Sequence, residues 1–252
     1  MTPGPIALVL ADVDGCLTAG EGRPIDLEVL AEVARVNERS RSDPHVPAIS
    51  LCTGRPAPYV EVLVQEIAAY RPSIFENGCG LLTMDPYGFM AHPRIDAEVM
   101  TAFRAGIESL DRALVVPGRA TWQPGKSYSG TLYPTDGDVH ALWVTARALL
   151  GDGFYVDEGV ECINVMPAGL DKGVGVEWLC SVADLSPDEV AGVGDAGSDL
   201  VFLDKVGFAA APANATPDVR AAVDFVASQP WGRGLLEIVD RIAHQNRRLS
   251  AA

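Results

Sequence analysis

The chain has 252 residues, 48% of them hydrophobic, and it carries 34 acidic against 19 basic side chains, for a formal net charge of −15. This length and hydrophobic content suit a globular core with a smaller insert and exclude a disordered chain. The negative charge repels phosphate polymers, so we expect no nucleic acid partner. The five cysteines form no CxxC pair. Their odd number cannot close a complete disulfide framework, so we expect a cytoplasmic protein. No apolar stretch reaches the roughly 20 residues of a membrane span, so we expect no membrane partner.

The first predicted strand covers residues 6–11 and ends in two carboxylates, Asp12 and Asp14, on a glycine turn. An apolar run that stops abruptly at charge is typical of a central strand in a parallel sheet, whose carboxyl end is where α/β folds bind ligands. Residues 25–36 then have the apolar spacing of a helix, with Pro24 suited to its first turn.

A second predicted strand, residues 46–52, ends at Thr53-Gly54-Arg55, and a helix over 60–68 follows it. A short strand over 73–75 then ends at Glu76-Asn77-Gly78. This alternation of strand and helix predicts an α/β fold with a mostly parallel sheet.

The pattern changes between residues 84 and 166. Two helical stretches are surrounded by short strand-like pieces, at 88–91, 113–116, 129–133, 155–156 and 162–166. The helical stretches cover 96–110 and 136–150. We expect residues 84–166 to form a smaller α+β domain, inserted into a core made of residues 1–83 and 167–252.

The core pattern resumes at Lys172, which opens a predicted helix. A strand over 190–193 then ends in Gly194-Asp195-Ala196-Gly197-Ser198-Asp199. Two short strands, at 207–210 and 224–226, precede a last helix with an apolar stripe at helical spacing.

Polar groups therefore follow several strand ends and helix starts: Asp12, Asp14, Thr53, Lys172, Asp195 and Asp199. Clustered carboxylates repel one another unless a hard cation holds them, and Mg²⁺ takes oxygen ligands while leaving room for phosphate and water. A lysine and a hydroxyl beside the metal would complete a site for a phosphoryl group. The sequence predicts phosphoryl transfer, with Asp12 attacking phosphorus and Asp14 serving as general acid and base.

Four motifs of the chain resemble, in order, those of the haloacid dehalogenase-like (HAD) phosphohydrolases: Asp12-Val13-Asp14-Gly15-Cys16-Leu17-Thr18, Thr53-Gly54-Arg55, Lys172 and Gly194-Asp195-Ala196-Gly197-Ser198-Asp199. The resemblance covers the whole chain. It implies a Rossmann-like core, a nucleophile at Asp12 and an acid/base at Asp14.

The same resemblance implies a phosphate site at Thr53, Gly54, Arg55 and Lys172. It also implies Mg²⁺ held by Asp12, the Asp14 backbone carbonyl and Asp195, with Asp199 in or near its coordination shell. Ser198 stands where asparagine is common in the family.

The insert lies between the second and third motifs, which resembles the C2-type cap of this superfamily. Its element order, and Glu76-Asn77-Gly78 before it, are similar to the Cof-like or phosphoglycolate and sugar-phosphate phosphatases. Residues 205–234 resemble instead the 3-deoxy-manno-octulosonate-8-phosphate phosphatases, which lack such a cap. The implied substrate is a small phosphorylated metabolite, either a sugar or sugar-acid phosphate or one like phosphoglycolate.

Additional candidates for substrate contact come from the core and the cap: Asn77, Asn214, Arg119, Lys126, Ser127, Ser129 and Tyr133. The alternative for the cap residues is a solvated surface position, as is usual for exposed polar residues of a small domain. We expect a monomer or a homodimer. Two alternative functions stay open: a phosphomutase or phosphotransferase similar to the phosphomannomutases, and a non-catalytic receiver-like domain that accepts a phosphoryl group.

Overall fold

The central sheet has five parallel strands in the order β12-β11-β10-β1-β2, so β1 lies between β10 and β2. The bounds are β1 Leu8–Ala11, β2 Ala48–Leu51, β10 Val190–Val193, β11 Phe208–Ala211 and β12 Phe225–Val226. The structure is a computed structural model that describes residues 4–251. The predicted α/β fold with a mainly parallel sheet is confirmed.

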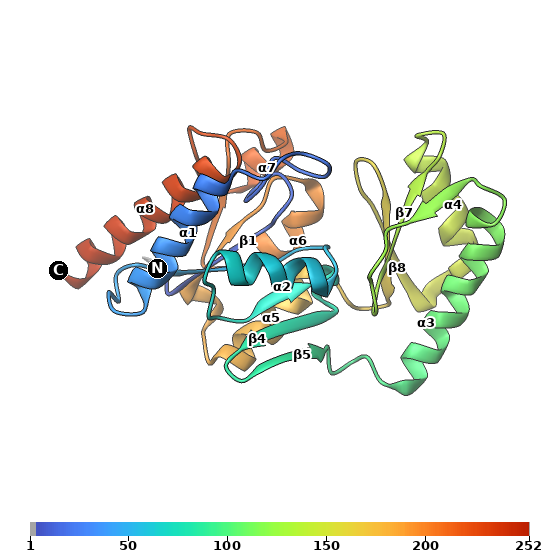
Figure 1. The fold of residues 1–252 in the computed structure, drawn as a ribbon, viewed down its shortest axis with the longest axis horizontal. Coiled ribbons are helices and arrows are strands. Elements are labelled where there is room, and N and C mark those ends of the chain that lie inside the picture. Colours follow the sequence, from blue (N-terminus) through green and yellow to red (C-terminus); the bar gives the residue numbers. More distant parts are fainter. Residues whose placement is uncertain (1–3, 252) are drawn as a thin grey trace.

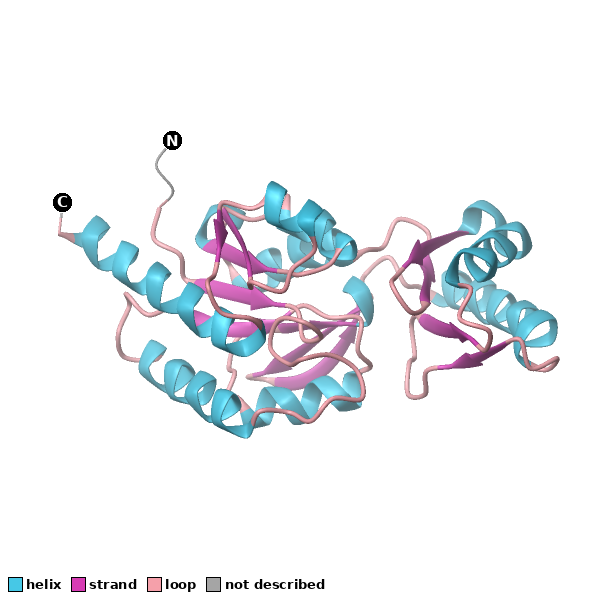
Figure 2. Cartoon of the chain, turned by 90° about the horizontal axis from the view of Figure 1, so that it is seen from above, coloured by secondary structure: helices cyan, strands magenta, loops and turns pink. Residues whose placement is uncertain are grey.

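Helices cover both faces of this sheet (Figure 2). Helices α1 (Leu27–Ser40), α2 (Ala57–Glu66) and α8 (Trp231–Ser250) pack on the face that carries Val9 and Ala11. The opposite face, with Leu8 and Leu10, is covered by α5 (Lys172–Ala183), α6 (Leu200–Leu203) and α7 (Pro217–Ala222). Burial on both faces explains why β1 is continuously apolar.

A second sheet of three antiparallel strands, β3 (Ser73–Phe75), β4 (Gly80–Met84) and β5 (Tyr87–Ala91), adjoins β2 through a bridge between Cys52 and Ile74. Strand β5 falls in the segment expected as the insert, residues 84–166, and its partner is β4.

We use "the cap" for residues 97–167. Its antiparallel sheet has the order β6-β7-β9-β8, with bounds β6 Ala120–Trp122, β7 Gly130–Pro134, β8 Phe154–Glu158 and β9 Ile163–Pro167. Helices α3 (Ala97–Leu110) and α4 (Val139–Leu150) pack on one side of this sheet, and β7 and β8 lie between them and the central sheet (Figure 1). The cap therefore has a hydrophobic core of its own.

The strand predicted over 113–116 is wrong. Residues Asp111–Val115 form a π-helical turn that continues α3, and Leu114 is buried in the cap core. A short apolar run fits a buried helical turn as well as a strand, because both bury consecutive side chains. Among residues 4–251, none of the helices has both the length and the hydrophobicity to cross a membrane.

Candidate active site

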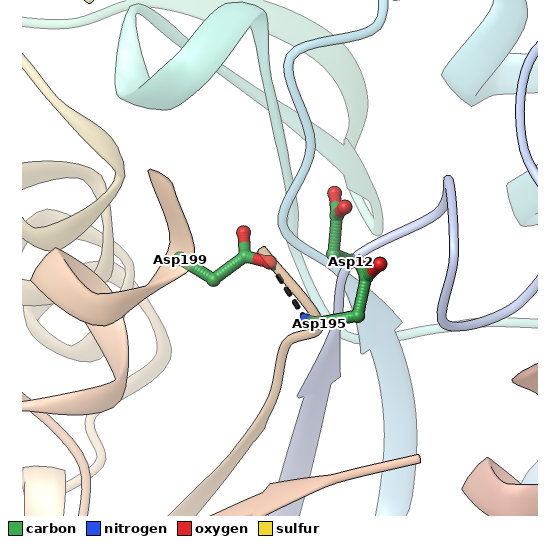
Figure 3. Close-up of side chains that lie close together, drawn as sticks. All are labelled: Asp12, Asp195 and Asp199. Atoms are coloured by element: carbon green, nitrogen blue, oxygen red, sulfur yellow. Dashed lines mark hydrogen bonds between the residues drawn. The ribbon is translucent and has the colours of Figure 1, made fainter. Parts of the chain in front are cut away.

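Three carboxylates, Asp12, Asp195 and Asp199, lie together at the carboxyl ends of β1 and β10 (Figure 3). One oxygen of each lies within 4.8 Å of the others. Asp12 and Asp195 come close because they follow neighbouring parallel strands, whose carboxyl ends meet at one edge of the sheet. The three side chains thus form one acidic cluster from residues up to 187 positions apart in sequence (199 minus 12).

Asp199 supports the loop that carries Asp195. Its Oδ2 atom accepts hydrogen bonds from the backbone N–H groups of Asp195 at 2.9 Å and Ala196 at 3.1 Å. Its Oδ1 atom accepts a third bond, from Lys172 at 2.7 Å. Asp199 is fully buried, and these bonds occupy both of its oxygens. The role of metal ligand that the sequence predicted for Asp199 stays a prediction. The hydrogen bonds show that Asp199 holds the loop that carries Asp195.

Lys172, the first residue of α5, supplies the positive charge of this cluster. Its Nζ atom lies 3.0 Å from Asp12 Oδ1 and 2.7 Å from Asp199 Oδ1. Burial alone would lower the pKa of Lys172, but the carboxylates of Asp12 and Asp199 outweigh it and raise that pKa. The ammonium group therefore stays charged.

One ammonium does not balance three carboxylates, of which Asp12 and Asp199 are buried and Asp195 is partly buried. Burial raises the pKa of Asp12 to about 8, Lys172 opposes that rise, and the charges of Asp199, Asp14 and Asp195 add to it. The pKa of Asp195 is raised to about 7, mainly by burial and then by repulsion from the charge of Asp199. Among the described residues, none donates a hydrogen bond to the Oδ2 atom of Asp12 or of Asp195. Oxygen donors with excess negative charge fit a hard divalent cation.

Gly15 lets the turn after β1 approach the cluster. Its φ angle is +91°, and a Cβ at this position would lie 2.1 Å from Asp195 Oδ2. Any other residue would both strain the backbone and displace the carboxylate. Asn214 holds the same turn, because its Nδ2 atom donates to the Gly15 carbonyl at 2.9 Å and its Oδ1 accepts from Trp231 N.

Asp14 is paired with Arg55 of the second motif. The guanidinium donates from Nε to Asp14 Oδ2 at 2.6 Å and from Nη2 to Oδ1 at 2.8 Å. Its Nη1 atom lies 3.2 Å from Glu21 Oε1. Burial works against the charge of Arg55, but the bonds to Asp14 and the charge of Glu21 outweigh it and raise the pKa of Arg55. The phosphate contact predicted for Arg55 stays a prediction; its partners here are carboxylates.

A cavity of about 120 Å³ lies above these residues, and both the core and the cap line it. Its lining contains eight of the residues predicted from sequence: Asp12, Asp14, Thr53, Gly54, Arg55, Asn77, Lys126 and Lys172. It also contains residues that were not assigned a binding role from sequence: Glu21, Gln123, Thr131, Cys162, Asn164 and Ser198.

Of the five cap candidates, Lys126 is in this lining, and Arg119, Ser127, Ser129 and Tyr133 are outside it. Arg119 is exposed and outside the cavity lining. Ser129 is buried, but its N–H and hydroxyl bond to Glu76 instead of facing the cavity. Asn214 also lies outside the lining, where it orders the Gly15 turn.

Glu21 and Glu76 connect the core to the cap, and the sequence interpretation missed both. Glu21 accepts bonds from Gln123 Nε2 at 3.0 Å and from the Tyr133 hydroxyl at 2.7 Å. Glu76 is fully buried, directly after the apolar strand β3. A lone acid directly after a buried strand was the signal available for Glu76. Glu21 offered less, because a carboxylate in a glycine-rich turn is usually solvated.

The fold and this site define the class to which the chain belongs. A family model described as haloacid dehalogenase-like hydrolase matches residues 145–238. The phosphoglycolate phosphatase of Pyrobaculum aerophilum is 30% identical over 236 residues, which cover 93% of this chain and 95% of that protein. The chain therefore belongs to the haloacid dehalogenase-like hydrolases and is a phosphoric monoester hydrolase.

Further relatives agree in sequence and in fold. The phosphoglycolate phosphatase of Methanopyrus kandleri is 27% identical over 245 residues, covering 95% of this chain and 98% of that protein. The crystal structure of protein 0175 of Thermoplasma acidophilum superimposes with a TM-score of 0.76 at 22% identity, over 94% of this chain and 98% of the other. A sucrose-phosphatase from Synechocystis, solved with sucrose and phosphate, shares the fold with a TM-score of 0.69 at 14% identity, over the same shares of the two chains.

Proposed function

We propose that the chain is a Mg²⁺-dependent phosphatase that hydrolyses a small phosphorylated metabolite, a phosphoglycolate-like or sugar-acid phosphate, through an aspartyl phosphate on Asp12. The observation that carries this proposal is the position of Asp12. It lies at the end of β1, in the cavity lining, within the acidic cluster and 3.0 Å from Lys172 Nζ. The phosphoglycolate phosphatases named among the relatives support the substrate class.

In the first step, an Asp12 carboxylate oxygen attacks phosphorus and the bond from phosphorus to the ester oxygen breaks. Lys172 would stabilise the charge on the phosphoryl oxygens, and Thr53 would donate a hydrogen bond to them. Bound Mg²⁺, held by Asp12 and Asp195, would reduce the repulsion between the carboxylate and the phosphate.

Asp14 would give a proton to the leaving alkoxide in the first step. In the second step it would take a proton from a water that attacks phosphorus, while the bond from phosphorus to the Asp12 oxygen breaks, which releases inorganic phosphate and restores the Asp12 carboxylate. Arg55 holds both oxygens of Asp14 in the structure. Each oxygen accepts one bond from Arg55 and keeps a second lone pair for a proton on the cavity side, and Asp14 is in the cavity lining. We therefore assign Arg55 a positioning role on Asp14.

Substituting the nucleophile tests the proposal. The Asp12→Asn variant keeps the size of the side chain but removes the attacking oxygen anion, so kcat for phosphoglycolate should fall about 10³-fold or more. Asp152, an exposed acid in the turn after α4, offers the matched control, and Asp152→Asn should retain the rate of the unmodified protein. Released inorganic phosphate is the readout, with Mg²⁺ and after its removal by EDTA.

Two results would overturn the proposal. One is full turnover by Asp12→Asn, which would exclude a covalent step at this residue. The other is undiminished phosphate release in EDTA. Transfer of the phosphoryl group to a second sugar, without phosphate release, would point to a mutase instead.

A further inference from the structure

The cavity is lined by three cationic side chains, and two of them are already paired with carboxylates. Arg55 is paired with Asp14 and Glu21, and Lys172 with Asp12 and Asp199. Lys126 is the third. Within residues 4–251 it forms no ion pair, and its Nζ atom donates to the hydroxyl of Thr131. Lys126 is thus a cation that faces the cavity without an anionic partner.

The loop between β6 and β7, residues 123–129, carries Lys126 and is fixed to the core. Glu76 accepts hydrogen bonds from the backbone N–H groups of Ser127 at 2.9 Å, Tyr128 at 2.8 Å and Ser129 at 2.8 Å. A fourth bond comes from the Ser129 hydroxyl at 3.1 Å. These bonds hold the segment directly after Lys126 in one conformation, so the ammonium group is held at the cavity wall.

The surroundings of Lys126 favour an anionic ligand. Lys126 is partly buried, and burial lowers its pKa to about 8, while Glu76, Cys162, Cys79 and Glu21 act to raise it. The group is therefore still mostly protonated at pH 7. A charge withdrawn from water without a counter-ion costs free energy, which a bound anion would offset.

The neighbours of Lys126 in the cap are polar. Gln123, Thr131 and Asn164 line the same cavity, and the Thr131 hydroxyl also donates to Asn164 Oδ1 at 2.7 Å. Asp12 and Lys172, which are contributed by the core, line the cavity as well. A ligand can thus place its phosphoryl group on the core residues and its other end on the cap residues.

We propose that Lys126 binds a carboxylate on the leaving-group part of the substrate, and so selects phosphorylated hydroxy acids of two or three carbons over phosphate monoesters whose leaving group is uncharged. The inference rests on the proposed phosphatase function and names the residue that would read the substrate. The cavity volume of about 120 Å³ limits the size, since sites for drug-sized ligands start at about 300 Å³. Charge supplies the selectivity, because an ion pair with the Lys126 ammonium is available only to an anion, whereas a neutral acceptor gains a hydrogen bond alone.

The test compares phosphoglycolate with the analogue in which a neutral carboxamide of nearly the same shape replaces the carboxylate. Both compounds keep the phosphate group. The unmodified protein should hydrolyse the acid with a kcat/KM about tenfold or more above that of the amide. Lys126→Met should lower this ratio by about 10- to 100-fold, and Lys126→Arg should retain a preference for the acid. Arg119→Met removes an exposed cap cation outside the cavity and should leave the ratio unchanged.

The outcomes separate this inference from the proposed function. If phosphate is released from acid and amide with equal efficiency, or if Lys126→Met slows both equally, Lys126 does not read a carboxylate, and the phosphatase assignment stands. If Mg²⁺ supports no phosphate release from either ester or from a broader panel, both proposals fall. If Lys126→Met does not fold, Lys126→Gln takes its place. The comparison is then between the acid-to-amide ratio of kcat/KM in the unmodified protein and the same ratio in Lys126→Gln.

Discussion

At the scale of single residues, the site depends on how closely the Gly15 turn approaches Asp195. Gly15→Ala should weaken Mg²⁺ binding, because the added methyl group would lie 2.1 Å from Asp195 Oδ2 and displace it. Gly137→Ala is the matched control, since Gly137 has a φ of +81° and a methyl group added there would meet no atom within 4 Å. Both variants should lose about 1 kcal/mol of free energy of unfolding, because alanine is strained at a positive φ angle.

Isothermal titration with Mg²⁺ distinguishes the two glycine variants. We expect a dissociation constant raised about tenfold or more for Gly15→Ala and an unchanged one for Gly137→Ala. Equal Mg²⁺ affinities in the two variants would mean that the approach of Gly15 to Asp195 does not shape the metal site.

The buried charge of Lys126 makes a separate prediction about stability. Its pKa is lowered by burial to about 8 in the folded chain, below the ordinary 10.5, so between these values the unfolded chain binds more protons. The stability of the unmodified protein should therefore rise with pH through this window. Lys126→Met removes the buried charge and should raise Tm by about 2–4 °C at pH 7, for a gain on the order of 1 kcal/mol.

Thermal unfolding of the two proteins between pH 7 and pH 10 checks the Lys126 prediction. The gain should shrink as pH rises, because the lysine loses its proton in the folded protein. A gain that is constant with pH would show that packing around the methionine, and not the charge, is the cause.

Much of the site was predictable at this scale because strand ends are predictable. Asp12, Thr53 and Asp195 each follow an apolar run, and parallel strands bring their carboxyl ends to one edge. The pairing of Asp14 with Arg55 was not predictable, since side-chain direction does not follow from spacing. For the same reason the sequence could not separate Arg119 from Lys126 as a substrate contact. Lys126 lines the cavity, whereas Arg119 lies outside its lining.

At the scale of elements, residues 127–129 of the loop 123–129 are held by the core carboxylate of Glu76. Glu76→Ala removes the acceptor of four hydrogen bonds and should loosen the loop by about 2–4 kcal/mol. Glu158→Ala is the control, because Glu158 is an exposed cap residue that pairs with exposed His140, and surface pairs contribute little.

Amide hydrogen exchange checks the loop prediction. The backbone N–H groups of Ser127, Tyr128 and Ser129 should exchange faster in Glu76→Ala and at an unchanged rate in Glu158→Ala. The KM for phosphoglycolate should rise in the same variant, since Lys126 would no longer be held at the cavity. If protection of these amides is unchanged, Glu76 does not hold the loop.

Elements were predictable where their periodicity was long and clear. The helices around β1 and the strands before the four motifs have such patterns, and they are present in the structure. The cap was harder, because its apolar runs fit either a strand or a helical turn, as the segment Asp111–Val115 shows. The π-helical turn at Asp111–Val115 and strand β6 were both missed for this reason.

At the scale of the whole molecule, the acidic cluster couples metal binding to the stability of the fold. Asp12, Asp195 and Asp199 come from distant parts of the chain and meet only when the central sheet is formed. An ion held by them binds the folded protein and not the unfolded chain. Mg²⁺ at 100 times its dissociation constant should then add about 2.7 kcal/mol of stability, and raise Tm by about 5–10 °C.

The control for this Mg²⁺ effect has to separate site binding from screening, because the chain has a net charge of −15. Sodium chloride at matched ionic strength screens the same repulsion without filling the site, and it should give a smaller shift. Asp195→Asn should lose most of the Mg²⁺ shift, since it removes one of the two carboxylates with a free oxygen, whereas Asp152→Asn should keep it. A full shift in Asp195→Asn would place the ion elsewhere on the molecule, and the acidic cluster would then be a structural feature held together by Lys172 and by the bonds from the Asp195 loop to Asp199.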